Sequence, residues 1–300
     1  MPNKSLIVLV GPTAIGKTAA SIQIAKEFNC PIVSADSRQF FKEMTIGTAK
    51  PSAEEMQNAP HYFIDSHSIK DEFNVGKYEN EAIALLDTLF KINKMVILVG
   101  GSGLYIDAIC KGFDELPEAD TEVRNKISLL LEEKGIKALQ SLLKELDSVY
   151  YSKVDLQNPQ RMSRALEVCL TTGKPYSTLR KGKIKKRNFN IIKIGLNTSR
   201  EVLYERINKR VDEMMQAGLL EEVKYLLPQK HLNALQTVGY NELFDFLENK
   251  TDLNTAVESI KQNTRKFAKR QLTWFGRDSE IKWFEPNEKK EILSYINSKF

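Results

Sequence analysis

The chain has 300 residues, of which 42% are hydrophobic and 28% charged, and its formal net charge is +5. This length predicts one large globular domain with a sizeable core and a smaller second part. No apolar run is long enough for a membrane span or a signal peptide, and the modest positive charge suits a polyanionic partner better than an acidic balance would.

The cysteines give a second constraint on the class of protein. Cys30, Cys110 and Cys169 are odd in number, lie far apart and form no CxxC pair. Such a set is typical of reduced thiols, not of a disulfide framework or a zinc site. We therefore expect a cytoplasmic protein without a membrane anchor.

Short apolar runs alternate with longer amphipathic stretches in the first hundred residues. The runs that predict buried strands span residues 6–10, 31–35, 95–99 and, later in the chain, 190–196. Helices are predicted over 17–28 and 104–110. Since strands that alternate with helices pair in parallel through right-handed crossovers, the pattern predicts a parallel α/β sheet.

Between residues 111 and 189 the pattern becomes purely helical. Helical periodicity covers 121–134, 136–146 and 160–172. We predict a helical domain of residues 111–189 inserted into a core of 1–110 and 190–300. The basic tract 180–187 near its end is either a solvated loop or a phosphate contact. Further helices are predicted at 199–217, 219–227, 240–247 and 253–275.

A GxxxxGK[ST] loop joins the first strand to the first helix. It consists of Gly11, Pro12, Thr13, Ala14, Ile15, Gly16, Lys17 and Thr18. The glycines let backbone N–H groups wrap an anion, the lysine adds a positive charge, and the hydroxyl of Thr18 can bind Mg²⁺. The following helix presents its positive end to the same anion. The loop therefore predicts a diphosphate or triphosphate ligand.

Asp36 is the acidic residue nearest to this predicted site. The strand at 95–99 ends in glycines and lacks the carboxylate that an ATPase uses to hold Mg²⁺. Asp36 instead follows the strand at 31–35, and ligands bind at the carboxyl ends of parallel strands. Its carboxylate either takes part in chemistry or caps the turn formed by 37–39.

Several longer motifs share the order seen in one known family. They are DSRQ at 36–39, GTAKP at 47–51, GGSGLY at 100–105, NPQR at 158–161, VGY at 238–240 and AKRQLTW at 268–274. Over nearly the whole chain, the set resembles the bacterial tRNA dimethylallyltransferases, also called tRNA isopentenyltransferases. Ile15, Phe41 and Ser102 depart from the usual Ser, Tyr and Thr of that family.

The resemblance implies a P-loop NTPase-like core and a definite reaction. The family transfers a dimethylallyl group from dimethylallyl diphosphate to N6 of the adenosine at position 37, next to the anticodon, in tRNAs that read codons starting with U. It implies that the loop, Arg206 and Mg²⁺ at Thr18 bind the diphosphate, and that Asp36 takes the N6 proton. Lys17, Thr13 and Arg206 would join Asp36 in catalysis. Arg210, four residues after Arg206, either assists or faces solvent.

The reacting adenine must leave its stack, so it is expected in a pocket near Asp36. The tRNA-binding residues implied by the resemblance are Asp36, Ser37, Arg38, Gln39, Ser102, Arg124, Gln160, Arg161, Met162, Ser163 and Arg164. The amide of Gln39 can pair with an adenine edge, and the inserted domain would hold the anticodon stem-loop. Thr13 and Ser102 are equally suited to backbone caps, and the charges on the helices at 160–172 and 253–275 are equally suited to solvent.

Two other functions share part of this pattern. A small-molecule or nucleotide kinase uses the same loop with an inserted lid, and it would turn over ATP. A nucleotide-dependent RNA-binding module would bind nucleotide without consuming an allylic diphosphate. The AKRQLTW motif and the basic C-terminal half favour the transferase. We expect it to act as a monomer.

Overall fold

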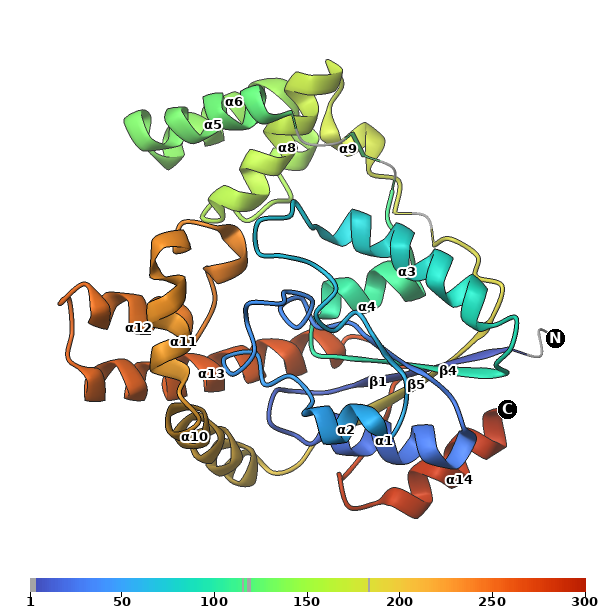
Figure 1. The fold of residues 1–300 in the computed structure, drawn as a ribbon. Helices are drawn as coiled ribbons and strands as arrows, with labels where there is room; N and C mark the ends of the chain where they lie inside the picture. The colour runs from blue at the N-terminus through green and yellow to red at the C-terminus, as the bar shows by residue number, and fades with distance from the viewer. Residues whose placement is uncertain (1–3, 115, 118–119, 183) are drawn as a thin grey trace. The chain divides into compact units, whose positions relative to one another are not determined.

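The computed structural model describes residues 4–114, 116–117, 120–182 and 184–300 (Figure 1). They divide into two compact units. Unit 1 contains the residues up to 110 together with 187–300, and unit 2 contains 111–186. Lys183, part of the basic tract predicted at 180–187, lies outside the described residues.

Unit 1 is built on a six-stranded sheet in the order β3-β2-β4-β1-β5-β6, in which every pair is parallel. The strands are β1 (Ser5–Val10), β2 (Ile32–Ser34), β3 (His61–Tyr62), β4 (Met95–Gly100), β5 (Asn190–Leu196) and β6 (Lys282–Phe284). The predicted parallel sheet is confirmed. The edge strands β3 and β6 were not predicted, because two or three residues at a sheet edge give no continuous apolar run.

The strand register brings three loops to one edge of the sheet. Val10 pairs with Gly100, and Ser34 pairs with Val99. The chain therefore leaves β1, β2 and β4 at the same level, and the loops that follow them begin side by side. This carboxyl edge is where ligands of parallel sheets bind.

The helices of unit 1 are α1 (Lys17–Phe28), α2 (Ala53–Gln57), α3 (Val75–Leu89), α4 (Gly103–Cys110), α10 (Arg200–Gln216), α11 (Leu219–Leu226), α12 (Tyr240–Leu247), α13 (Leu253–Phe275) and α14 (Lys289–Lys299). The predicted helices are confirmed to within a residue or two at their ends. Helices α2, α3 and α14 were not predicted from the sequence.

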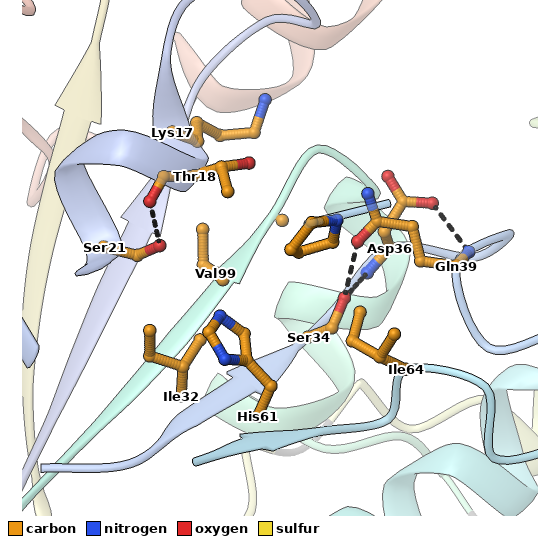
Figure 2. Close-up of a pocket in the computed structure, with 12 residues that line it drawn as sticks. Lys17, Thr18, Ser21, Ile32, Ser34, Asp36, Gln39, His61, Ile64 and Val99 are labelled. Carbon is orange, nitrogen blue, oxygen red and sulfur yellow. Dashed lines mark hydrogen bonds between the residues drawn. The ribbon is translucent and has the colours of Figure 1, made fainter. Parts of the chain in front are cut away.

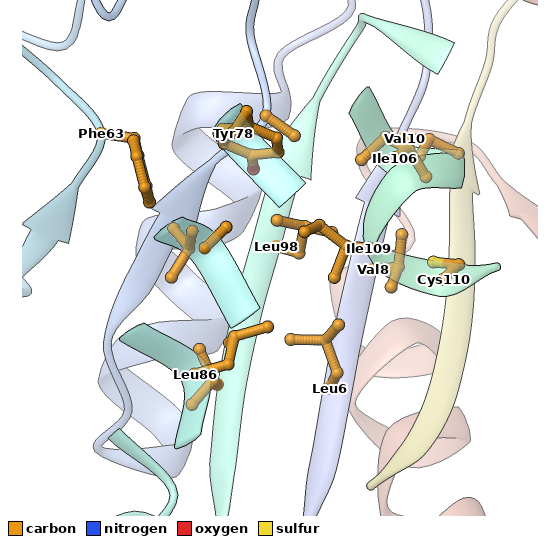
Figure 3. Packing of buried hydrophobic residues seen from close by; sticks show 14 of the residues in the cluster. Leu6, Val8, Val10, Phe63, Tyr78, Leu86, Leu98, Ile106, Ile109 and Cys110 are labelled. Atoms are coloured by element: carbon orange, nitrogen blue, oxygen red, sulfur yellow. The ribbon is translucent and has the colours of Figure 1, made fainter. Parts of the chain in front are cut away.

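Helices cover both faces of the sheet because the side chains of β1 alternate. Leu6, Val8 and Val10 pack with α3 and α4, as Figure 3 shows for Tyr78 and Ile109. The opposite face places Ile7 and Leu9 against α1, α10 and α14. A strand buried on both sides needs this continuous apolar run.

A third apolar cluster joins α10, α11, α12 and α13 to the loop after β2. Phe41 and Met44 from that loop are buried with Leu219, Tyr240 and Ile260. This cluster anchors the loop that follows Asp36 to the helical C-terminal part of unit 1.

Unit 2 contains α5 (Thr121–Lys134), α6 (Ile136–Leu146), α7 (Ser148–Tyr151), α8 (Pro159–Thr172) and α9 (Tyr176–Leu179). Its core is formed by Leu139, Leu143, Met162 and Leu166. Asn158 caps α8, and Pro159 occupies its first turn. Within its described part, unit 2 contains no strand. None of the helices described in either unit is long and apolar enough to span a membrane.

Candidate functional site

The loop between β1 and α1 has the backbone conformation that its glycines require. Gly11 has φ 152°, and a Cβ there would lie 2.6 Å from the carbonyl oxygen of Leu196. Gly16 has φ 104° at the start of α1. Other residues are strained at such angles, so the loop geometry depends on these two positions. The first-turn N–H groups of α1 then face the carboxyl edge of the sheet.

An open pocket of about 400 Å³ lies beside the loop (Figure 2). Lys17 and Thr18 line it from α1, and Asp36 and Gln39 line it from the segment that follows β2. Ile32, Ile64 and Val99 make another part apolar. His61, which was not predicted from the sequence, also lines the pocket and donates from Nδ1 to the Ala59 carbonyl oxygen at 2.8 Å.

Lys17 is held inside the loop. Its Nζ donates to the carbonyl oxygens of Gly11 at 3.0 Å and Pro12 at 2.7 Å. Burial and, to a smaller extent, the nearby Arg210 lower the pKa of Lys17 to about 7, although Asp36 opposes the shift. The positive charge is therefore held where an incoming anion would relieve an unfavourable burial.

Two arginines of α10 reach the same loop. Arg206 donates to the Ile15 carbonyl oxygen at 3.2 Å, and Arg210 donates to Thr13 Oγ1 at 3.4 Å. Burial lowers the pKa of Arg210, although Asp36 and Glu213 oppose that shift. The structure thus brings both arginines to the loop, and Arg210 is the less exposed of the two.

Asp36 uses one carboxylate oxygen to cap the turn that follows β2. Its Oδ1 accepts from Arg38 N at 2.9 Å and Gln39 N at 3.4 Å. Among the described residues, no hydrogen bond reaches the second oxygen, Oδ2. The carboxylate lines the pocket, so it can cap the turn and still accept a proton from a ligand (Figure 2).

The other predicted residues around Asp36 make contacts within the protein. Ser102 Oγ accepts from Ser37 N at 3.0 Å and donates to Ser37 Oγ at 3.1 Å. Gln39 Oε1 accepts from Ser34 Oγ at 3.3 Å, and its Nε2 donates to the carbonyl oxygens of Thr48 and Ala49. Burial lowers the pKa of Arg38. The amide of Gln39 is thus engaged by the fold on both sides.

The role of Gln271 in α13 was not predicted from the sequence. Its Oε1 accepts from Thr13 N at 2.8 Å, and its Nε2 donates to the Gly101 carbonyl oxygen at 2.9 Å. One buried amide therefore joins the phosphate loop to the loop after β4. The available signal was a polar residue between Ala268 and Phe275 on the buried face of a helix.

The residues present fit a bound Mg²⁺ that accompanies a diphosphate. Thr18 lines the pocket next to Lys17, and its hydroxyl oxygen is the hard, neutral ligand that this ion accepts. Mg²⁺ takes most of its remaining ligands from phosphate oxygens and water. Among the described residues, no group of three His, Cys, Asp or Glu side chains gathers as a metal site.

In unit 2, the predicted residues fall into two groups. Arg124 Nε donates to Glu167 Oε1 at 3.0 Å, and Arg164 Nη1 donates to Glu167 Oε2 at 3.1 Å. The Glu167 side chain is only 7% exposed. Gln160 and Arg161 are exposed on the first turn of α8, and Ser163 is half-buried. Met162 is fully buried in the core of the unit, so its side chain packs against its neighbours.

Comparisons with known proteins agree on one family. The model of the IPP transferase family matches residues 39–278. The chain is 55% identical to the tRNA dimethylallyltransferase of Christiangramia forsetii, with 98% of each chain covered. It is 47% identical to tRNA dimethylallyltransferase 1 of Bacteroides fragilis, with 99% of each covered.

Solved structures give the same result. The full-length tRNA isopentenylpyrophosphate transferase of Bacillus halodurans superposes with a TM-score of 0.73 at 35% identity, covering 99% of this chain and 96% of that one. A eukaryotic dimethylallyltransferase acting on tRNA superposes with a TM-score of 0.80 at 25% identity, covering 99% of this chain and 77% of the other. The P-loop NTPase-like fold predicted from the sequence is thereby confirmed.

Proposed function

The chain belongs to the IPP transferase family, and we propose that it transfers a dimethylallyl group from dimethylallyl diphosphate to N6 of adenosine 37 in tRNAs that read codons starting with U. The observation that carries this proposal is the pocket in which the half-buried Lys17 faces Asp36 across the carboxyl edge of the sheet. Such a pocket suits an anionic leaving group on one side and a proton donor on the other.

The transfer forms one N–C bond and breaks one C–O bond, and a proton moves from N6 to the protein. The lone pair of N6 attacks C1 of the dimethylallyl group, the C1–O bond breaks, and diphosphate leaves with the bonding electrons. Loop N–H groups, Lys17, Arg206 and Arg210 stabilise the charge that grows on the leaving group. Mg²⁺ at Thr18 would add further positive charge there.

Asp36 completes the reaction by accepting the proton that N6 loses. N6 is a weak nucleophile because its lone pair is delocalised into the ring, so removal of the proton must accompany bond formation. Oδ2 is the oxygen available for this, since Oδ1 already caps the turn at Arg38 and Gln39. In the phosphate loop, Thr13 Oγ1 accepts from Arg210, so this hydroxyl is a further polar group where the diphosphate would bind.

The tRNA-binding role of unit 2 is part of the same proposal. Gln160 and Arg161 are exposed at the start of α8 and can contact RNA phosphates. Arg124 and Arg164 hold Glu167 and would shape the surface that α8 presents. The monomeric state and the cytoplasmic location stay predictions, which light scattering and cell fractionation would test.

One reaction tests the function directly. The protein is incubated with Mg²⁺, dimethylallyl diphosphate and an anticodon stem-loop RNA, and the RNA is digested and weighed by mass spectrometry. We expect one adenosine to gain a single dimethylallyl group, and a stem-loop with guanosine at that position to gain none. Consumption of ATP without transfer would instead favour a kinase, and RNA binding without consumption of the allylic diphosphate would favour a binding module.

A further inference from the structure

The motifs at 47–51 and 238–240 take no part in the chemistry proposed above, yet they meet in the structure. Gly47 lies against the buried ring of Tyr240, and a Cβ at position 47 would be 2.5 Å from Cε2 of that ring. The loop after β2 can approach α12 this closely only because residue 47 has no side chain.

Glu222 of α11 binds this loop through three consecutive backbone donors. Its Oε2 accepts from Thr45 N at 3.0 Å and Ile46 N at 2.7 Å, and its Oε1 accepts from Gly47 N at 3.0 Å. The hydroxyl of Tyr240 donates to the same Oε1 at 2.7 Å. Consecutive N–H groups of this kind form a concave anion site, and here a carboxylate of the chain itself fills it.

The same loop continues to Asp36. The carbonyl oxygens of Thr48 and Ala49 accept from Gln39 Nε2 at 3.2 Å and 3.1 Å. The backbone N of Gln39 in turn donates to Asp36 Oδ1. Glu222 is therefore linked to the Asp36 carboxylate by hydrogen bonds at residues 45–47, 48–49 and Gln39, which the backbone of the loop and the Gln39 residue itself join covalently.

We propose that Glu222 is a positioning residue that holds Asp36 in the orientation needed to accept the N6 proton. The inference rests on the proposed function only in assigning that task to Asp36. A carboxylate is required, because the four donors demand acceptors on both of its oxygens. A glutamine would offer one oxygen and turn its own NH₂ group toward donors. The first turn of α11 also favours the negative charge.

The test compares Glu222→Gln with Glu221→Gln, a neighbouring exposed position that contacts Lys224 at 4.0 Å. In single-turnover reactions we expect Glu222→Gln to slow transfer roughly ten- to hundredfold, as small displacements of a reacting group do. The KM for dimethylallyl diphosphate should not change, because Lys17 and the loop N–H groups are untouched. Glu221→Gln should behave as the wild type.

The effect must pass through Asp36 if the proposal is right. In an Asp36→Asn background, Glu222→Gln should therefore slow the residual rate little further, since residues that act as one unit are not additive. An equal slowing in both backgrounds would overturn the proposal, because that is the behaviour of a general structural residue. A wild-type rate in the single Glu222→Gln variant would also overturn it.

Hydrogen–deuterium exchange gives a result that does not depend on activity. In Glu222→Gln we expect faster exchange at residues 45–47 and also at 38–39, and the absence of any change at 38–39 would overturn the proposal. If the wild type transferred no prenyl group while exchange still responded, the proposed function would fail and the structural coupling would stand. If Glu222→Gln did not fold, Tyr240→Phe, which removes one of the four donors, would decide with the same two measurements.

Discussion

Lys17 at the phosphate loop differs from the arginines of unit 2 in what balances its charge. Burial is the main reason that the pKa of Lys17 falls to about 7, and burial also lowers the pKa of Arg210. Arg124 and Arg164 instead share the carboxylate of Glu167. Cations that lack a full counter-charge attract an anionic ligand, whereas cations already paired with a carboxylate mainly shape the structure around them.

Replacing Asp36 should have the largest effect on the reaction. We expect Asp36→Ala and Asp36→Asn to slow single-turnover transfer by about a hundred- to ten-thousand-fold, the usual contribution of a general base. Asparagine keeps an oxygen that can cap the turn at Arg38 and Gln39, so it isolates the loss of proton acceptance. Binding of the stem-loop RNA, measured by fluorescence anisotropy, should stay close to the wild type.

A rate within a few-fold of the wild type in both Asp36 variants would exclude this residue as the base. If only Asp36→Ala were slow, the carboxylate would matter for the turn and not for the proton. The two variants therefore separate the two readings of Asp36 that the sequence left open.

Replacing Lys17 tests the cation that has no hydrogen-bonded carboxylate. We expect Lys17→Met to slow transfer by about a hundred- to thousandfold, because it removes a donor to the developing charge. The free energy of unfolding should rise, since a buried charge that burial penalises has been removed. Urea denaturation measures this second effect. A fall in stability would show that Lys17 is already compensated without a ligand.

Replacing an arginine that is paired with a carboxylate should change the free energy of unfolding in the opposite direction. Arg164→Met removes one of the two partners of Glu167, whose side chain is only 7% exposed. We expect the free energy of unfolding of unit 2 to fall by about 1–3 kcal/mol, the usual cost when a buried polar group loses a hydrogen-bond partner. The rate of transfer at saturating RNA should change little. If Arg164→Met left stability unchanged but abolished RNA binding, Arg164 would belong to the RNA contact and not to the scaffold.

Arg161 is the exposed cation of α8, and its replacement should weaken RNA binding without loss of stability. We expect Arg161→Glu to lower the magnitude of the slope of log affinity against log salt by about 1, because the loss of one phosphate contact reduces the number of counterions released on binding. Affinity for dimethylallyl diphosphate should not change. Lys137→Glu, an equal charge reversal at an exposed position of α6, is the control. Equal salt slopes for both variants and the wild type would show that Arg161 of α8 does not contact RNA phosphates.

Much of the fold could be predicted, because buried strands and amphipathic helices leave periodic patterns. The strands at 6–10 and 190–196 and the helix at 253–275 lie where the sequence places them. The strands β3 and β6 are too short for such a pattern, and each occupies a sheet edge. Periodicity reports burial along one element, so it misses strands of two or three residues.

The site was only partly accessible from the sequence, for a different reason. The phosphate loop and Asp36 stand out because they follow strands directly. Gln271 contacts Thr13, 258 positions earlier in the chain, and Glu222 contacts Thr45, 177 positions earlier. Nothing local distinguishes these two side chains from other polar residues of helices. Their contacts arise from tertiary packing, which a single sequence does not reveal.

Lys193 is a buried cation that extends this comparison, and its replacement has the smallest expected effect. Lys193 of β5 donates to Asp278 at 2.7 Å and to Glu280 at 2.6 Å. Burial alone would lower the pKa of Lys193, but these two carboxylates outweigh it and raise the pKa above its usual 10.5. Loss of hydration acts on both Lys193 and Lys17, and their pKa values move in opposite directions because only Lys193 donates hydrogen bonds to carboxylates.

The sign of the pH dependence follows from that shift. A lysine whose pKa is higher in the folded state stabilises the fold fully below its unfolded value, and that contribution is lost as pH rises through the folded pKa. We therefore expect the free energy of unfolding to fall in alkaline solution above pH 10.5. In Lys193→Met this particular loss should be absent, because no proton is released at that position. Urea titrations at pH 8 to 11 compare the two proteins, and parallel alkaline losses would show that Lys193 does not contribute.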